Sequence, residues 1–218
     1  MPVHDSAKLT TATSRRDRPA TLTEDQIVDA ALSVIREEGL DALSMRRLSR
    51  ELGRSAMAVY WYVDDKKQLL DLVARKMLAE VALPDPIVGS WEERLHLIVD
   101  EIDAKLREHP GMAEILLERM LSTDRRLMNG IMDILLSAGF EGAEIFLTYA
   151  MIHTYLFGRY QVVLHAEEIY SMQPEDNADT VARMLPHLND VRGRDFFAFG
   201  VRTIIAGLRN HLEAKLQT

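Results

Sequence analysis

The sequence predicts an all-α protein in which a small three-helix head precedes a larger helical bundle. Apolar residues recur at helical spacing in successive segments of the 218-residue chain. Capping residues and glycines mark the ends of these segments, and no segment alternates apolar and polar residues as a half-buried strand would. With 47% apolar residues, the chain is long enough to bury a substantial core.

The first helix of the head is the most strongly marked. Apolar residues at helical spacing follow Thr23, and Gln26 stands three residues further on, as in a capping box. Gly39 is placed to end the helix. The head as a whole is predicted over residues 21–66.

The next two helices are joined by a tight turn. A second helix is expected to start at Ser44 and run to Leu52, followed at once by Gly53, which tolerates the positive φ of a sharp turn. Ser55 is placed to cap a short third helix. Two helices joined in this way are typical of a helix-turn-helix, which indicates DNA as a partner.

A fourth helix, capped near Asp64 or Asp65, is expected to connect the head to the body over residues 67–83. The body is predicted over residues 84–218, with proline and glycine residues separating its helices. Its expected helices are 91–107, a short one opened by Pro110 and reaching Leu121, 124–138, 141–167 and 193–216.

Charge is distributed unevenly along the chain. Residues 1–76 hold 13 Lys and Arg against 12 Asp and Glu, and the remainder holds 13 against 22, so the net charge of −8 belongs to the body. The predicted reading unit, residues 43–58, is locally basic, which suits a surface that meets phosphates. Its charged residues are Arg46, Arg47, Arg50 and Arg54 against Glu51.

Several classes of protein are excluded by composition. The chain has no cysteine, which excludes disulfides, thiolate catalysis and Cys-based zinc sites. It has no apolar stretch long enough to span a membrane, and its first twenty residues lack the apolar core of a signal peptide. We therefore expect a cytoplasmic protein that does not enter membranes.

Residues 1–20 are polar, lack periodicity and are expected to be disordered in the free protein. They carry a basic cluster at Arg15, Arg16 and Arg18. Two interpretations remain open: a tail without function, or an arm that reaches the neighbouring minor groove of DNA.

A dense set of residues extends over the head and the start of the fourth helix: Ala30, Ala31, Gly39, Leu43, Ser44, Arg46, Leu48, Leu52, Gly53, Ser55, Tyr60, Tyr62, Lys66, Leu69 and Leu70. This pattern resembles the N-terminal signature of the tetracycline-repressor (TetR) family, and residues 60–66 are similar to members close to the tetracycline repressor itself. The resemblance implies an all-helical homodimer with a DNA-binding head and a ligand-binding body. It also implies a regulator, most often a repressor, that a small molecule releases from a palindromic DNA operator.

The resemblance implies that the third helix lies against base edges and that the aromatic residues at its end reach phosphate and sugar. Since Ala56, Met57 and Ala58 offer only apolar contacts, hydrogen-bonded readout would fall to Ser55, Arg46 and Arg54. For Tyr60, packing inside the head is an equal alternative. The expected DNA-binding residues are Ser44, Arg46, Arg54, Ser55, Ala56, Met57, Ala58, Tyr60, Trp61, Tyr62 and Lys66.

In this family the body helices line a ligand cavity, and methionines and aliphatic residues on them suit a deformable apolar pocket. Polar side chains on or beside apolar faces are candidates to orient a ligand, although a single His such as His153 is more often a satisfied core residue. The expected apolar lining is Ile98, Ile102, Met112, Ile115, Leu116, Met120, Met128, Met132 and Phe146. The expected polar residues are Glu101, Arg119, Tyr149 and His153.

We expect no cofactor and no metal. The residues that hold tetracycline and its magnesium in the tetracycline repressor correspond here to Ala82, Ile98 and Ile115, so the effector should be another, mostly apolar organic molecule. Glu92, His96 and Asp100 form an i, i+4, i+8 series that could supply metal ligands, but a solvated helix face explains it equally.

The last two long segments, 141–167 and 193–216, are apolar around more than half of their circumference. They are either central in the monomer or part of a two-fold interface, in which Gly200 and Gly207 would allow close helix approach. The resemblance implies the second arrangement, a four-helix bundle shared by two subunits, and hence a homodimer.

Two other functions compete with regulation by a ligand. One is a helical enzyme or small-molecule carrier, against which stands the lack of a nucleophile with its base, a phosphate loop or a metal signature. We therefore expect no catalytic residues. The other is a DNA-binding adaptor that works without a small ligand.

Overall fold

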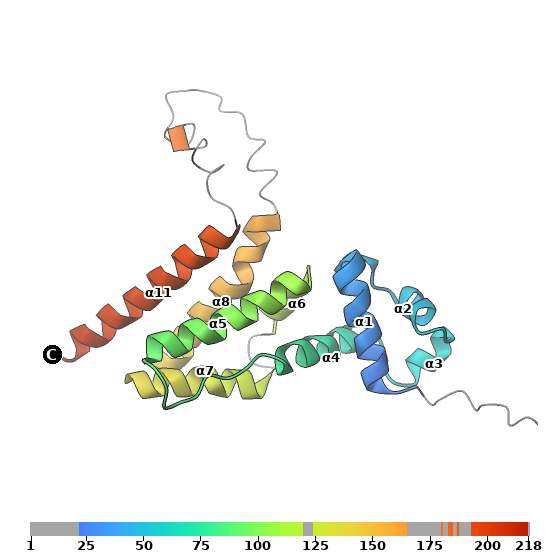
Figure 1. The fold of residues 1–218 in the computed structure, drawn as a ribbon, viewed down its shortest axis with the longest axis horizontal. Helices are drawn as coiled ribbons and strands as arrows, with labels where there is room; N and C mark the ends of the chain where they lie inside the picture. The colour runs from blue at the N-terminus through green and yellow to red at the C-terminus, as the bar shows by residue number, and fades with distance from the viewer. Residues whose placement is uncertain are drawn as a thin grey trace, which may run out of the picture.

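The computed structural model describes residues 22–119, 124–164 and 193–217 together with Thr180, Arg183, Met184 and His187, and these residues form helices with no strand (Figure 1). The predicted all-α fold is confirmed. The basic cluster at residues 15–18 lies outside the described residues. The elements are α1 (Glu24–Glu38), the 3₁₀ helix η1 (Leu40–Ala42), α2 (Met45–Glu51), α3 (Ala56–Tyr60), α4 (Lys66–Ala79), α5 (Trp91–Glu108), α6 (Met112–Leu117), α7 (Arg125–Ala138), α8 (Ala143–Leu164) and α11 (Gly193–Lys215).

Local capping chemistry sets the boundaries of α1. The Thr23 hydroxyl accepts a hydrogen bond from the Gln26 backbone N–H at 3.2 Å, and the Gln26 side chain accepts one from the Thr23 N–H at 3.1 Å. This reciprocal pair satisfies two N–H groups that the first turn leaves unbonded. Gly39 ends the helix with φ 85°. The predicted capping box and terminus are confirmed.

The helix-turn-helix is also confirmed in detail. Ser44 caps α2 by accepting from the Arg47 N–H at 3.1 Å, and Ser55 caps α3 by accepting from the Ala58 N–H at 3.3 Å. Between the two helices Gly53 has φ 59°, a left-handed conformation that strains residues with a Cβ. Leu48 and Val59 are fully buried and anchor α2 and α3 in the core of the head.

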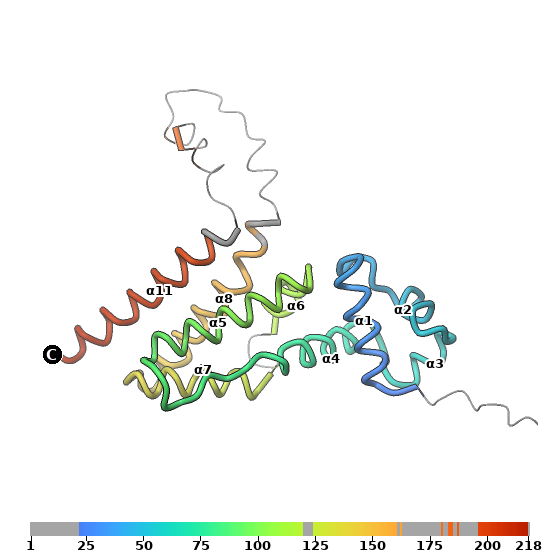
Figure 2. The backbone as a smooth tube through the Cα atoms, in the orientation of Figure 1, coloured from blue at the N-terminus to red at the C-terminus, as the bar shows by residue number. Residues whose placement is uncertain are grey.

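Helix α4 belongs to both parts of the molecule, and the backbone passes through it from head to body (Figure 2). It starts at the cap Asp65, whose carboxylate accepts from the Gln68 N–H at 2.7 Å. On the head side, Lys76 lies 2.8 Å from Asp29 and 3.2 Å from Asp25 of α1. On the body side, α4 contacts α5, α6 and α7, and its buried residues belong to one hydrophobic core that extends from head to body.

The body is built from α5, α6, α7, α8 and α11, with the C-terminus at the end of the molecule opposite the head (Figure 1). Helix α8 contacts α6, α7 and α11, and α5 packs on α7. Within the described ranges, no helix is both long and apolar enough to cross a bilayer. The prediction that Pro110 opens the short helix is wrong by two residues: α6 begins at Met112 because Gly111, with φ 90°, forms its N-terminal cap.

Gly200 plays a different part from the one predicted. A Cβ there would lie 1.9 Å from the Tyr155 hydroxyl oxygen, and that hydroxyl donates to the Phe196 carbonyl at 2.6 Å. The glycine therefore permits close packing of α11 against α8 within one subunit. Gly207, in contrast, is exposed with no atom within 4 Å of its Cβ position.

A buried charge cluster ties α5, α8 and α11 together. The Asp103 carboxylate accepts from the Arg159 guanidinium and, at 2.9 Å, from the Tyr160 hydroxyl. The Arg159 guanidinium also lies 4.4 Å from the ring centres of Tyr160 and Phe197. Both charged groups are almost fully buried, so each depends on the other for compensation.

Candidate DNA-binding face and body cavity

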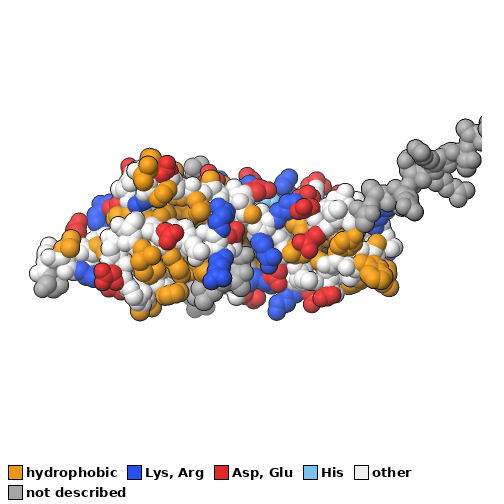
Figure 3. Space-filling model, turned by 90° about the horizontal axis from the view of Figure 1, so that it is seen from below, with side chains coloured by type: hydrophobic (Ala, Val, Ile, Leu, Met, Phe, Trp, Pro, Cys, Tyr) orange, Lys and Arg blue, Asp and Glu red, His pale blue; other side chains and the backbone are white. Residues whose placement is uncertain are grey.

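Helix α3 presents large apolar side chains to solvent. Trp61 at its C-terminal end is 82% exposed, Met57 is 68% exposed and Tyr60 is 46% exposed. Hydrophobic side chains gather at the head end of the molecule in the space-filling view (Figure 3). Side chains of this size remain exposed together chiefly where a partner covers them, so this ridge is a candidate contact surface.

The cations beside this ridge are not equivalent. Arg46 and Arg50 on α2 are exposed. Arg47 is held by Glu38 at 2.6 Å and Glu51 at 2.8 Å, and these hydrogen bonds raise the pKa of its guanidinium. Of these two carboxylates only Glu51 was expected beside the arginines from the sequence, whereas Glu38 reaches Arg47 from the end of α1. Arg47 therefore braces α2 against α1, while Arg46 and Arg50 face solvent.

The remaining predicted DNA contacts surround α3. Ser44 and Ser55 use their oxygens as helix caps and keep their hydroxyl protons for donation. Ala56 and Lys66 are exposed, whereas Arg54 and Ala58 are half-buried. Lys66 is the first residue of α4, and the others lie on or next to the two helices of the helix-turn-helix.

Tyr62 differs from its expected placement. It is half-buried, and its hydroxyl donates to the Leu22 carbonyl, which precedes α1. Its phenol thus joins the segment after α3 to the segment before α1 and does not extend outward. Tyr60, for which packing in the head was the alternative, is the one that reaches solvent.

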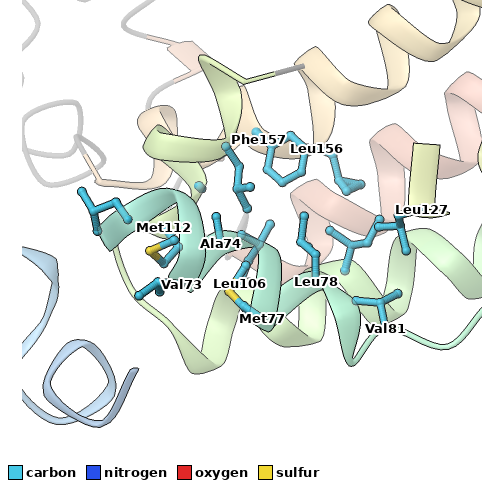
Figure 4. Close-up of a cluster of buried hydrophobic side chains, with 14 of the residues drawn as sticks. Val73, Ala74, Met77, Leu78, Val81, Leu106, Met112, Leu127, Leu156 and Phe157 are labelled. Atoms are coloured by element: carbon cyan, nitrogen blue, oxygen red, sulfur yellow. The ribbon is translucent and has the colours of Figure 1, made fainter. Parts of the chain in front are cut away.

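A largely apolar cavity lies in the body where α4, α5, α6, α7 and α8 converge. The space between its side chains is about 40 Å³, and Figure 4 shows four of its walls, Leu78, Leu127, Leu156 and Phe157. The full lining is Leu78, Val99, Ile102, Leu116, Arg119, Asp124, Leu127, Met128, Ile131, Tyr149, Ile152, His153, Leu156 and Phe157.

Six of the predicted ligand contacts line this cavity: Ile102, Leu116, Arg119, Met128, Tyr149 and His153. Six others do not. Ile98 and Met112 are buried elsewhere in the core, Ile115 and Met132 are half-buried away from the cavity, and Glu101 and Phe146 are exposed. Met120 lies outside the described residues.

The lining residues missed by the sequence analysis are Leu78, Val99, Asp124, Leu127, Ile131, Ile152, Leu156 and Phe157. On α8 a signal was present. Residues 149, 152, 153, 156 and 157 follow the i, i+3, i+4, i+7, i+8 pattern of a single helix face, so the face that contains His153 also contains the other four.

Burial controls the protonation of the two polar residues of α8 in the cavity. Desolvation lowers the pKa of His153 to about 4, opposed by a hydrogen bond to the Leu116 backbone, so the ring is neutral near pH 7. Desolvation also raises the pKa of Tyr149 to about 12, so its phenol keeps its proton. Arg119, a cationic residue of the lining, forms an ion pair with Asp71 of α4.

The series Glu92, His96 and Asp100 does not converge on one point. Glu92 accepts from Arg209 at 2.9 Å, and His96 lies 3.3 Å from Asp100. Among the described residues, no group of three or more His, Asp or Glu side chains is arranged to hold a metal ion.

Comparison with known proteins identifies both parts of the chain. Residues 27–73 match the family model of bacterial regulatory proteins of the tetR family, and residues 83–212 match the tetracyclin repressor-like C-terminal domain. An HTH-type transcriptional regulator of Saccharopolyspora erythraea is 31% identical over 169 residues, which cover 77% of this chain and 69% of that protein. The HTH-type transcriptional repressor DrrR1 of Streptomyces coeruleorubidus is 29% identical over 216 residues, covering 89% and 80% respectively.

A solved structure supports the same assignment. The TetR family protein ActR of Streptomyces coelicolor, in complex with (S)-DNPA, is 28% identical and superimposes with a TM-score of 0.73, covering 88% of this chain and all of that one. The exposed helix α3 of the helix-turn-helix, the body cavity and these matches lead to one conclusion: the chain belongs to the TetR family and is a ligand-responsive, DNA-binding transcriptional regulator.

Proposed function

We propose that this protein is a cytoplasmic homodimeric repressor that leaves a palindromic operator when a mostly apolar organic molecule occupies the body cavity. The observation that carries the proposal is the double role of α4. Its residue Leu78 lines the cavity, and two residues earlier Lys76 is bonded to α1 of the head. A displacement of the cavity wall therefore moves the element that supports the DNA-binding helices.

The C-terminal end of α4 is held by the body through several bonds. Arg126 of α7 donates to the carbonyls of Leu78 at 3.0 Å and Val81 at 2.9 Å, and Lys105 of α5 lies 2.6 Å from Glu80. The bonds from Arg126 satisfy backbone carbonyls at the C-terminal end of α4, which lack partners within the helix. A movement of α5 or α7 around a ligand is thereby transmitted to α4.

The size of the cavity gives the ligand a preference between conformations. Drug-sized ligands occupy pockets of roughly 300–1,000 Å³, far more than the space of about 40 Å³ between these side chains. An effector must therefore push the walls apart, and it favours whichever arrangement of α4 accompanies the wider cavity. Only such a difference in affinity between two states can release DNA.

The relatives support an organic effector and negative control. ActR has been solved with (S)-DNPA and with actinorhodin, and DrrR1 is a repressor. Of the functions considered from the sequence, an enzyme has the least support, because the relatives are transcriptional regulators.

Unpartnered apolar surface on α8 and α11 supports a homodimer. Leu147 and Met151, one turn apart on α8, are 69% and 43% exposed, and Phe199 on α11 is 64% exposed. The exposed backbone at Gly207 would let a second helix approach closely. In a two-fold dimer, the two α3 helices could enter successive major grooves on one face of the DNA, which lie about 34 Å apart.

Operator selection with the purified full chain tests the proposal. DNA fragments enriched from random sequence should share inverted half-sites, and Trp61→Ala should weaken binding to them about tenfold or more. The control is Leu136→Ala, a similarly exposed apolar residue on α7 (54%), which should leave affinity unchanged. Equal effects of both variants, or enrichment of no sequence, would contradict the proposed interface. Compounds that raise the melting temperature should then release the operator.

A further inference from the structure

One face of α8 carries three aromatic side chains spaced four residues apart. Tyr149, His153 and Phe157 are all buried and all line the cavity. The ring centres of Tyr149 and His153 are 6.1 Å apart, and those of His153 and Phe157 are 4.6 Å apart. Aromatic faces at these separations offer offset or edge contacts to another ring, so this wall suits a flat, unsaturated ligand.

His153, at the centre of this wall, has a fixed hydrogen-bonding polarity. Its hydrogen bond to the Leu116 backbone raises the pKa of the ring, as a bond to an accepting carbonyl does, so we infer that the ring nitrogen there carries the proton. Burial keeps the ring neutral, and a neutral imidazole has one N–H and one lone pair. Because Leu116 takes the N–H, what the ring can offer a ligand is an acceptor.

The charges of the lining do not favour an anion. Arg119 is balanced by its ion pair with Asp71. The Asp124 carboxylate also lines the cavity, where it accepts from the Leu127 N–H at 3.1 Å and lies 3.9 Å from the Arg126 guanidinium. A carboxylate placed beside His153 would thus meet a lone pair, and the charge of Arg119 is already balanced, whereas a hydroxyl group would meet an acceptor.

We propose that the effector is a neutral hydroxylated aromatic compound, with a phenol or enol hydroxyl that donates to His153 and a ring system that packs on the Tyr149–His153–Phe157 wall. This inference rests on the proposed function, because it takes the cavity as the effector site. It goes further by making His153 the residue that selects the ligand.

Matched naphthalenes test the inference on the full chain. 2-Naphthol can donate a hydrogen bond, whereas naphthalene and 2-methoxynaphthalene cannot and bracket it in size; 2-naphthoate adds a negative charge. Measured by titration calorimetry near neutral pH, 2-naphthol should bind about 3- to 10-fold more tightly than either neutral analogue, the range expected for one hydrogen bond. 2-Naphthoate should bind most weakly.

Variants of His153 assign the preference to this residue. His153→Phe should bring the affinities of 2-naphthol and naphthalene together, while His153→Gln, which keeps a donor for Leu116 and an acceptor for the ligand, should restore the preference. His96→Phe, on the surface of α5, is the control and should behave as the parent protein. Because the comparison is between ligands on the same variant, a general loss of stability does not imitate the result.

The outcomes separate the two proposals. Equal binding of 2-naphthol and its methyl ether to the parent protein, tighter binding of 2-naphthoate, no binding of any probe, or a preference that survives His153→Phe would each overturn the inference. If 2-naphthol is preferred through His153 but leaves operator affinity unchanged at saturation, the ligand class stands and the proposed release mechanism is wrong.

Discussion

Arg119, at the end of the α6 segment, forms an ion pair with Asp71 near the middle of α4. Arg119 also lines the cavity, so the same side chain contacts both the ligand space and the helix that leads to the head. Leu78, one of the cavity walls, lies two turns further along α4. The cavity is thus linked to α4 at two points, directly through Leu78 and indirectly through the Arg119–Asp71 pair, and these two links can convert a change in cavity shape into a tilt of the helix.

Asp71→Asn should weaken the coupling between effector and DNA without abolishing either binding event. Removing this ion pair loosens the connection between α4 and the α6 segment. Substitutions at residues that connect two binding sites change the coupling free energy between those sites by about 0.5–2 kcal/mol. The measurement is the ratio of operator affinities with and without a saturating effector. Asp133→Asn, on an exposed part of α7, is the control and should leave that ratio unchanged. An unaltered ratio in Asp71→Asn would show that α4 does not carry the signal through this bond.

The arginines of α2 should differ in their effect on DNA binding. Arg46→Ala and Lys66→Ala each remove an exposed cation and should reduce the salt dependence of operator affinity by about one phosphate contact. Arg46→Ala should also relax discrimination among single-base variants of the operator. Arg47→Ala should lower the stability of the head instead, because Arg47 is bonded to Glu38 and Glu51. Affinities measured across a series of salt concentrations distinguish the two classes. A smaller salt slope for Arg47→Ala alone would mean that the docking face is misassigned.

The head could be predicted closely because its determinants are local. Thr23, Ser44 and Ser55 cap their helices through atoms three residues away, and Gly53 takes the positive φ that its turn requires. Such interactions depend on neighbours in the sequence and are visible in it.

The cavity could be predicted only in part, because which residues line it depends on how whole helices are rotated and packed against one another. Ile98 and Ile102 lie one turn apart on α5 and are both buried, but only Ile102 lines the cavity. Phe146 and Tyr149 lie three residues apart on α8, yet one is exposed and the other buried. A helix that is apolar on most sides does not reveal from sequence which side faces a ligand, which faces the core and which is left for a partner.

His153 should make the protein less stable as the pH falls from about 6.5 to about 4. The pKa of His153 is about 4 in the folded protein against about 6.5 for an ordinary histidine, so in this window the unfolded chain binds a proton that the folded protein excludes. The stabilisation is complete above pH ~6.5, and its loss amounts to roughly 3 kcal/mol below pH ~4. Urea unfolding of the parent protein and of His153→Gln should show a difference in unfolding free energy that shifts across this window. A pH-independent difference would mean that the imidazole is not buried in neutral form.

Leu147→Glu should convert the protein to a monomer. The substitution places a charge on the exposed apolar face of α8, where burial against a partner would desolvate it at a cost of several kcal/mol. Sedimentation equilibrium at micromolar concentration should show the mass of one subunit, and operator affinity should fall because the two heads are no longer held together. Leu97→Glu, on exposed α5 surface, should remain dimeric. If both variants remain dimeric, the dimer interface does not include this face of α8.

Met128→Trp should fill the cavity and reduce effector binding while preserving the dimer. Met128 lies on α7 and lines the cavity, and the larger indole would compete for the roughly 40 Å³ present between the walls. The added ring must displace neighbouring side chains, Leu78 of α4 among them, so the variant should also resemble the ligand-bound state and bind the operator more weakly. Ile115→Trp provides the contrast, because Ile115 lies outside the cavity and its replacement should leave effector affinity nearly unchanged. Calorimetry with a confirmed effector and operator titration in its absence measure the two effects. Undiminished effector binding by Met128→Trp would place the ligand site elsewhere in the body.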